Sequence, residues 1–537
     1  MTMAPQVPDP DPNGPARRRG VRAWIPITSI VLAGAGIALI QRSENTEEII
    51  RFMWSMMAGG ALILLLLGWF LFFSRLRWRI RLYGLLLFVM FVIAFVSLVR
   101  IDGTYSGGGR LRLTWRWSPP RGADVGELVT SRPVDTGAAA LPAFDSPVYL
   151  GAEHLGVIRG LNLDTNWAAH PPVELWRRKI GLGWSSFAVV GSQAITLEQR
   201  GDDELIVDYE LATGHVLWTH TNRVRFHEIM GGDGPRATPA IAEGRVYSEG
   251  ATGILDCLAL PTGQLIWSRD TLKEDRAPNL MWGKSCSPLL VDDLVVVTGG
   301  ASAAGPALLA FKRADGAPAW HAGTENASYV TPMLVTLAGR RQILCVNAAT
   351  VTGHDPSDGR ILWKYTWLND QHPKCAQPLV LDGDRVFLSA DYGYGCVMLR
   401  ISGDAGGNMS ATELWKGRTL KSQLSNMIAR DGCIFGLDDG ALACIDAATG
   451  AGKWRDDRGS SQRYGHGQVL LVGDVLLQNE RGPLALVEAN PSSLRELATF
   501  PALTSKTWNV PAIAGEYLLV RNDLEAVCYR LPVRAGK

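Results

Sequence analysis

The chain has 537 residues, of which 47% are hydrophobic and 20% are charged, and its 53 Lys and Arg side chains nearly balance 52 Asp and Glu. This composition excludes a collagen-like chain, a disulfide-rich mini-protein and an intrinsically disordered protein. The net charge of +1 is the sum of two opposite parts. Residues 1–100 contain 11 Arg, no Lys, two Asp and three Glu, which gives +6, so residues 101–537 must carry −5. No part of this balance indicates nucleic-acid binding.

Residues 1–22 are predicted to form a disordered tail, because the five Pro among the first 15 residues stand in a polar stretch that cannot bury enough apolar surface to fold. Residues 23–100 then contain three uncharged apolar runs, at 23–40, 52–73 and 82–99. About 20 helical residues span a bilayer, so these runs predict three transmembrane helices. A cleaved signal peptide is the alternative for the first run. It is not favoured, since no small-x-small cleavage site ends the run and two more spans follow.

The arginines predict how these helices are oriented. Four Arg precede the first span, four more lie between spans two and three, and the loop between spans one and two has two Arg but three Glu. Because Arg-rich loops stay in the cytoplasm, the N-terminus is expected there. Three spans then place everything after Arg100 outside the cytoplasm. The predicted location is the inner membrane, with a periplasmic domain.

Residues 101–146 are rich in Gly, Pro and Arg, and are predicted to be a linker that contains a short strand at 111–117. Residues 147–537 then contain a repeated unit, Thr-Gly or Asp-Gly followed after three residues by Trp. The five full copies end at Trp218, Trp267, Trp320, Trp363 and Trp454; weaker copies end at Trp176 and Trp415, and an eighth, at Ala498, has lost its Trp.

The spacing of 39–53 residues between copies predicts an all-β, eight-bladed β-propeller with four strands in each blade. The Gly allows a positive φ at a hairpin turn, and the Trp is expected to pack between blades. Inner strands are expected to start near Ser186, Thr238, Ser287, Thr331, Gln377, Asn426, Gln468 and Pro511. The last unit has three strands, and the segment 173–178 is expected to supply its fourth and close the ring.

The Thr-Gly-x-x-x-Trp repeat resembles the PQQ-like (pyrroloquinoline-quinone-like) propeller repeat family, over residues 173–532. That family includes quinoprotein dehydrogenases and an eight-bladed lipoprotein of outer-membrane β-barrel assembly. The resemblance implies the propeller fold; it is weak for function because the repeat is a packing motif.

The resemblance also provides a test for catalysis. Quinoprotein dehydrogenases use a disulfide between adjacent Cys over the cofactor, and acidic residues that hold calcium and act as base. No two of the eight Cys here are adjacent, and no such acidic set can be placed on this sequence. We therefore expect no cofactor, with PQQ possible but unsupported, and most Cys are expected to be free, buried side chains.

The loops that lead into the inner strands predict one candidate ligand site at the mouth of the central channel. Six of them carry a cation, which would focus positive potential on an anionic ligand, a small molecule or a polymer. The alternative is a scatter of loop cations, since Glu228, Asp233 and Glu325 lie in the same loops. The candidate ligand-binding residues are Arg236, Lys284, Lys374, Lys421, Arg463, His466, Lys506, Trp508 and Asn509.

The sequence favours a membrane-anchored, extracytoplasmic propeller that binds or scaffolds envelope proteins and has no catalysis of its own. A PQQ-dependent dehydrogenase is the alternative. A third hypothesis is an envelope enzyme acting on an anionic polymer, for which no nucleophile is found. Whether the protein is an enzyme stays open at this point.

Overall fold

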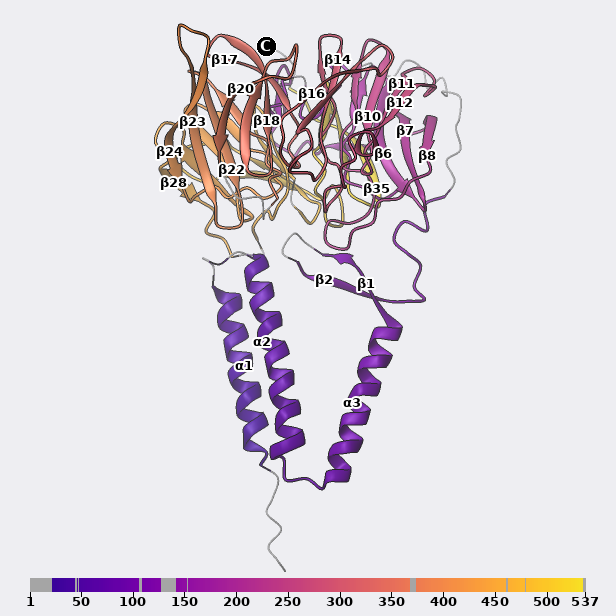
Figure 1. Cartoon of the computed structure of the whole chain (residues 1–537), viewed down its shortest axis with the longest axis vertical. Coiled ribbons are helices and arrows are strands. Elements are labelled where there is room, and N and C mark those ends of the chain that lie inside the picture. The colour runs from indigo at the N-terminus through magenta and orange to yellow at the C-terminus, as the bar shows by residue number, and fades with distance from the viewer. Residues whose placement is uncertain are drawn as a thin grey trace, which may run out of the picture. The chain divides into compact units, whose positions relative to one another are not determined.

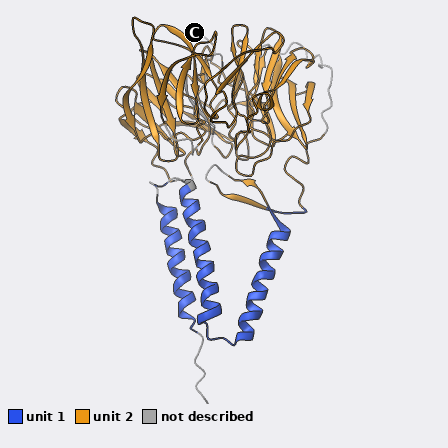
Figure 2. Ribbon diagram, in the orientation of Figure 1, with its two compact units in different colours: residues 1–100, 114–117 blue, residues 101–113, 118–537 orange. Residues whose placement is uncertain are grey.

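The computed structural model describes residues 22–43, 46, 48–105, 109–126, 142–151, 153–367, 373–459, 462–478 and 480–534. Residues 1–21 of the expected disordered tail lie outside them. The chain divides into two compact units (Figure 2), one of residues 1–100 and 114–117 and the other of residues 101–113 and 118–537.

The first unit contains three long apolar helices. They are α1 (Trp24–Arg42), α2 (Glu48–Gly68), which continues as the π-helix η1 (Trp69–Phe73), and α3 (Trp78–Leu98). Within the described residues, these three are long and apolar enough to cross a membrane. Their Leu, Ile and Phe side chains are largely exposed, an arrangement that suits lipid rather than water. The three predicted spans are confirmed as helices.

The second unit consists of eight antiparallel blades, each of at least four strands (Figure 1). The first four blades are β5 (Ala188–Val190), β6 (Gln193–Arg200), β7 (Asp203–Glu210) and β8 (Val216–Asn222); β9 (Ala240–Ala242), β10 (Arg245–Glu249), β11 (Ile254–Ala259) and β12 (Leu265–Asp270), followed by α4 (Thr271–Glu274); β13 (Leu289–Val291), β14 (Leu294–Thr298), β15 (Leu308–Lys312) and β16 (Pro318–Ala322); and β17 (Met333–Leu337), β18 (Arg340–Val346), β19 (Thr350–His354) and β20 (Ile361–Thr366).

The remaining four blades are β21 (Leu379–Leu381), β22 (Arg385–Ala390), β23 (Gly395–Gly403) and β24 (Met409–Gly417); β25 (Ile428–Arg430), β26 (Cys433–Asp438), β27 (Ala441–Asp446) and β28 (Gly452–Arg455); β29 (Val469–Val472), β30 (Asp474–Gln478), β31 (Leu484–Val487) and β32 (Glu496–Phe500); and β33 (Ala512–Ala514), β34 (Tyr517–Arg521), β35 (Glu525–Arg530) and β4 (Val173–Lys179). Each inner strand starts one or two residues after its predicted start, so the expected eight-bladed architecture is confirmed.

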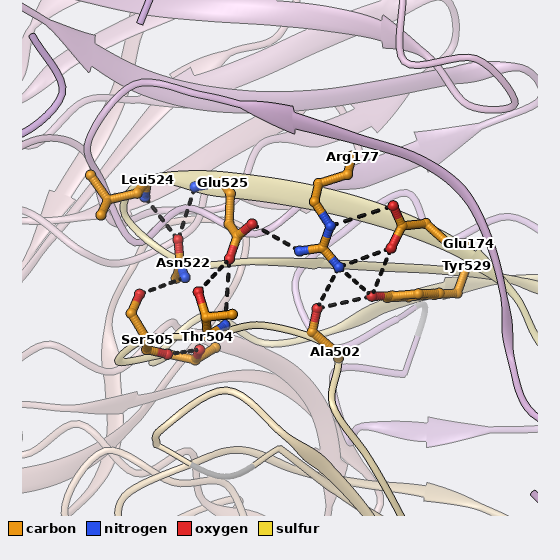
Figure 3. Close-up of polar contacts among 10 residues, drawn as sticks. Glu174, Arg177, Ala502, Thr504, Ser505, Asn522, Leu524, Glu525 and Tyr529 are labelled. Carbon is orange, nitrogen blue, oxygen red and sulfur yellow. Dashed lines mark hydrogen bonds and ion pairs between the residues drawn. The ribbon is translucent and has the colours of Figure 1, made fainter. Parts of the chain in front are cut away.

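The eighth blade is closed by β4, which comes from the start of the propeller sequence and pairs antiparallel with β35. Arg177 on β4 holds this seam together (Figure 3). Its guanidinium donates to Glu525 at 2.8 Å, to the hydroxyl of Tyr529 at 2.8 Å and to the carbonyl of Ala502 at 3.1 Å. The inner strands β33 and β5 also contact each other, so the eighth blade lies next to the first.

The repeated Gly and Trp form the contact between successive blades. A Cβ on Gly263 would lie 2.4 Å from the ring of Trp218, which belongs to the preceding blade, and Gly263 has a φ of 67°. Only Gly fits that close approach and that backbone conformation. The indole of Trp218 then donates to the carbonyl of Leu260 at 2.8 Å. The same Gly-on-Trp packing occurs at Gly214, Gly316, Gly359 and Gly450.

The segment expected to be a linker contains more structure than predicted. β1 (Val99–Thr104) and β2 (Leu111–Trp115) form a two-stranded sheet, which confirms the predicted short strand. Further along, Arg121 forms an ion pair with Asp523 at 2.7 Å, and Arg200 donates to the carbonyl of Gly126 at 2.7 Å. In the described parts of this segment, its many Gly and Pro therefore do not prevent side-chain contacts with the propeller.

Residues 145–151 and 153–164 form a strap across several blades, an element that no pattern in the sequence predicts. Ser146 bridges to Val189 of β5, and Pro147 accepts a hydrogen bond from the backbone of Ile241, which lies on β9. β3 (Val157–Ile158) then adds a parallel strand to β29, and the chain leaves beside residues 532–534 of the last blade.

Candidate functional site

The loops that lead from the outermost strand of one blade into the inner strand of the next are called approach loops here. Their last residues form a belt of hydrogen bonds between neighbouring blades. The backbone N–H of Ser186 donates to Thr238 Oγ1 at 3.3 Å, that of Thr238 to Ser287 Oγ at 2.9 Å, and that of Ser287 to Thr331 Oγ1 at 3.0 Å. The hydroxyl of Ser186 donates to the carbonyl of Val510 in the eighth blade.

The belt continues through amide side chains in the other blades. Gln377 Nε2 donates to the carbonyl of Thr331 at 2.7 Å. Asn426 donates to Gln468 Oε1, and Gln468 Nε2 donates to the carbonyl of Trp508 at 2.9 Å. The polar residues that mark the inner-strand starts therefore connect one blade to its neighbour. Their chemistry serves ring closure, because each satisfies a buried polar group of the adjacent blade.

Lys506 lies at the mouth between two tryptophans. Its Nζ is 3.9 Å from the ring centre of Trp508 and 5.0 Å from that of Trp184, and it donates to Thr104 Oγ1 at 3.2 Å. The indole of Trp508 donates to Glu480 at 2.9 Å. Burial lowers the pKa of Lys506 to about 8. The charges of Asp523 and Glu480 oppose this shift, and the two indole faces are placed to stabilise the ammonium group as well.

Lys284 does not reach the mouth. Its side chain is fully buried, and Nζ lies 3.2 Å from Glu249 and 3.0 Å from the carbonyl of Gly299. Thr298 accepts further hydrogen bonds from the same ammonium group. The charge of Lys284 is therefore neutralised inside the blades, and the structure leaves no surface of this side chain for a ligand.

Arg236 turns back onto its own approach loop. Its guanidinium donates to the carbonyls of Gly232 and Gly234 and lies 4.5 Å from the ring centre of Phe226. Burial lowers its pKa to about 10, although the nearby Glu228 and Asp233 oppose this shift. The residue as a whole is only partly buried, but its guanidinium is held by the carbonyls of its own loop and by Phe226.

The other predicted side chains are also held by neighbours or are buried. Lys421 forms an ion pair with Asp438 at 3.8 Å, and Arg463 donates to the carbonyl of Arg458 at 3.1 Å. Asn509 Nδ2 donates to the carbonyl of Ser185 at 2.8 Å. Lys374 and His466 are buried. The structure thus brings Lys506, Trp508 and Trp184 together, but gives each of the other cations a local partner or a buried position. Whether this set binds an anion stays a prediction.

Tyr149 of the strap packs beside residues of the belt. It borders a small cavity together with Ser186, Thr238 and Val510. Burial raises the pKa of Tyr149 to about 12, while Asn426 opposes the shift by hydrogen bonding. The cavity lining otherwise consists mainly of apolar side chains and backbone.

The cysteines fit the prediction of free side chains. All eight lie in the described part of the chain and none is paired in a disulfide there; seven are buried and Cys375 is partly exposed. Burial raises the pKa of Cys286 to about 11 and that of Cys396 to about 12. Such thiols are poor nucleophiles and poor metal ligands at neutral pH.

The described residues do not fit a PQQ site of the kind that the sequence resemblance implies. Adjacent cysteines are missing, and no group of three or more His, Cys, Asp or Glu side chains in the described ranges could hold a metal ion. The acidic side chains nearest the mouth, Glu228 and Glu480, bind their own loop and Trp508. No reaction step through this cofactor follows from the geometry.

Comparisons with known proteins agree with the fold. Residues 201–456 match the family model described as outer membrane protein assembly factor BamB. The protein of that name from Xanthomonas campestris pv. campestris is 31% identical over 99 residues, which are 18% of this chain and 24% of that protein. The match therefore spans about a quarter of that relative.

Two solved structures have the same architecture. A europium-containing methanol dehydrogenase has a TM-score of 0.53 at 11% identity, covering 71% of this chain and 90% of its own. The quinohemoprotein alcohol dehydrogenase from Comamonas testosteroni has a TM-score of 0.52 at 12% identity, covering 75% and 83%. At such identities the likeness shows the fold alone. The resemblance to PQQ-like propeller repeats is confirmed for this chain.

Proposed function

We propose that the chain is a membrane-anchored binding module that presents its propeller to protein partners in the envelope, and that it catalyses no reaction itself. Its proposed position is the inner membrane, with the N-terminus in the cytoplasm and the propeller in the periplasm. The match to an outer membrane protein assembly factor supports an envelope role, since that name places the matched relative in the assembly of outer membrane proteins.

The observation that carries this proposal is that the cations of the approach loops interact with side chains of the propeller itself. Lys284 is neutralised by Glu249, Lys421 is paired with Asp438, and Lys506 lies between two indoles. These groups stabilise the ring instead of converging on a reacting atom. A rigid ring with exposed loops is suited to docking other proteins, because little conformational entropy is lost when it binds.

The approach loops of the second and third blades offer a specific docking surface. Ile229 and Met281 expose 41% and 71% of their surface, and a Cβ on Gly231 would lie 2.9 Å from Trp282, so the two loops are in contact. The partly exposed Arg236 borders them. Apolar and aromatic side chains beside an Arg are typical of the centre of a protein interface. The anionic ligand that the sequence predicts for the approach loops would then be an acidic side chain of the partner protein.

The proposal is tested by mild-detergent extraction of tagged full-length protein from its native membranes, followed by quantitative recovery of bound proteins. Changing Ile229 and Met281 together to Glu should reduce recovery of the specific partner at least tenfold. The matched control changes Leu265 and Ile266 to Glu; these side chains are 43% and 42% exposed on β12 of the second blade. Recovery with the control should equal that of the wild type.

Two outcomes would contradict the proposal. The first is that no protein is recovered above the level of an unrelated three-helix membrane protein. The second is that both pairs of changes reduce recovery equally. The dehydrogenase alternative is tested on the same preparation by adding PQQ and Ca²⁺ and following dye-linked alcohol oxidation. Alcohol oxidation that depends on added PQQ would show that the protein is a dehydrogenase and would contradict the proposed binding role.

A further inference from the structure

The β1–β2 hairpin follows the third membrane helix without a spacer. α3 ends at Leu98 and β1 begins at Val99. The backbone N–H of Arg116 donates to the carbonyl of Leu98 at 2.8 Å, and its guanidinium donates to the carbonyl of Val96 at 3.1 Å. Residues 114–117 accordingly group with the helices and not with the propeller (Figure 2). The end of the hairpin is thus fixed to the last turn of α3.

The hairpin exposes a row of apolar side chains. Leu113 and Trp115 lie two residues apart on β2, the spacing that places side chains on one face of a strand, and Trp117 follows in the turn after it. They expose 50%, 51% and 66% of their surface. The two indoles stack, with ring centres 5.0 Å apart and planes at 6°. In water, this row would be an unfavourable apolar surface.

The same segment is strongly basic. Residues 99–117 contain four Arg and one Asp. One of these side chains, Arg112, lies 5.8 Å from the ring centre of Tyr105, which is itself exposed. Tryptophan and tyrosine gather where a bilayer meets water, and Arg next to a membrane helix is attracted to lipid phosphates. A row of indoles with flanking Arg is therefore complementary to the headgroup region of an anionic bilayer.

We propose that the β1–β2 hairpin is an interfacial anchor, with Trp115 and Trp117 inserted among the lipid headgroups at the membrane surface where α3 ends. This goes beyond the proposed binding of protein partners. The lipid surface is favoured over a protein as the occupant because Arg116 binds the last turn of a membrane helix directly. The anchor would restrict rotation of the segment that joins the membrane helices to the propeller.

The test uses the full-length protein in nanodiscs made of phosphatidylcholine and phosphatidylglycerol. Tryptophan fluorescence is measured with lipids brominated either near the headgroup or near the chain end, for the wild type and for the double variant W115F and W117F. Subtracting the fluorescence of the double variant from that of the wild type gives the signal of Trp115 and Trp117 alone. Quenching of that difference signal should be several-fold stronger with the shallow bromines. Aqueous iodide should quench it weakly.

A control variant, W320F and W454F, removes two partly buried blade tryptophans instead. Its difference signal should not respond to brominated lipid. The proposal is overturned if the hairpin difference signal is insensitive to both brominated lipids, or if iodide quenches it as strongly as free tryptophan. It is equally overturned if lipid quenching appears only after a partner protein has been removed, since a protein would then cover the hairpin. None of these results depends on partner recovery by the propeller.

Discussion

Lys284 Nζ lies 3.2 Å from Glu249, and neither side chain has exposed surface. Removing one member of a buried pair leaves the other charge without compensation, at a cost of about 3–5 kcal/mol. K284M should therefore lower the free energy of unfolding by about that amount, measured by chemical denaturation. The double variant K284M and E249M should recover much of the loss. As a control, K179M removes an exposed pair with Asp124 and should change stability little. A K284M protein as stable as the wild type would show that the pair is not buried as described.

Glu204 gives a prediction on pH. Its pKa is raised from the ordinary 4.5 to about 7, mainly by burial and to a smaller extent by Asp256 and Glu249, although a hydrogen bond from the backbone of Ala251 and the charge of Arg236 oppose the shift. Between pH 4.5 and 7 the unfolded chain releases this proton and the folded chain keeps it, so stability falls as the pH rises through that window. Relative to E204Q, the wild type should lose roughly 3 kcal/mol between pH 4 and pH 8, from about 1.4 kcal/mol per pKa unit. A difference that is constant with pH would exclude a raised pKa for Glu204.

Variants of Tyr149 test whether this side chain holds the strap against the blades. Truncating a fully buried aromatic side chain costs about 3–5 kcal/mol, and for the partly buried Tyr149 we expect roughly 2 kcal/mol for Y149A. Y149F keeps the ring and should cost less than half of that. Limited proteolysis should cleave Y149A within residues 145–164 faster than it cleaves the wild type. Cleavage of Y149A and of the wild type at the same rate would mean that Tyr149 does not hold the strap against the blades.

The positions of the Arg residues predict on which side of the membrane each terminus lies. An alkaline phosphatase reporter fused after Lys537 should be active, and the same reporter fused before Met1 should be inactive, because this enzyme folds only outside the cytoplasm. This expectation follows from the positive-inside rule, because four Arg precede α1 and four more lie between α2 and α3. The opposite pattern of activity would reverse the proposed location of the propeller, whatever its partners are.

The blade architecture is readable from the sequence because its signals are local. The Gly and Trp of each repeat lie a few residues apart in sequence, and the turn they mark requires a positive φ, as at Gly263. The starts of the inner strands follow from the same spacing. The eighth Trp could be lost at Ala498 without loss of its blade, since β32 still pairs with β31.

The partners of the predicted cations could not be read from the sequence in this way. Glu249 and Lys284 lie 35 residues apart in different blades, and Thr104 reaches Lys506 across 402 residues. The strap was missed because β3 is two residues long and carries no repeat motif. A set of loop cations at equivalent positions looks like one site in sequence, but each side chain is oriented by neighbours that do not repeat.

The central claim is that the approach loops of the second and third blades contact a partner protein. It is tested most directly by placing a photo-crosslinking amino acid at position 281 of the full-length protein in living cells, and at position 265 as the control. Irradiation should produce a specific adduct at 281, of a protein that the I229E and M281E variant fails to recover, and little or none at 265. No adduct at 281, or the same adducts at both positions, would contradict the account.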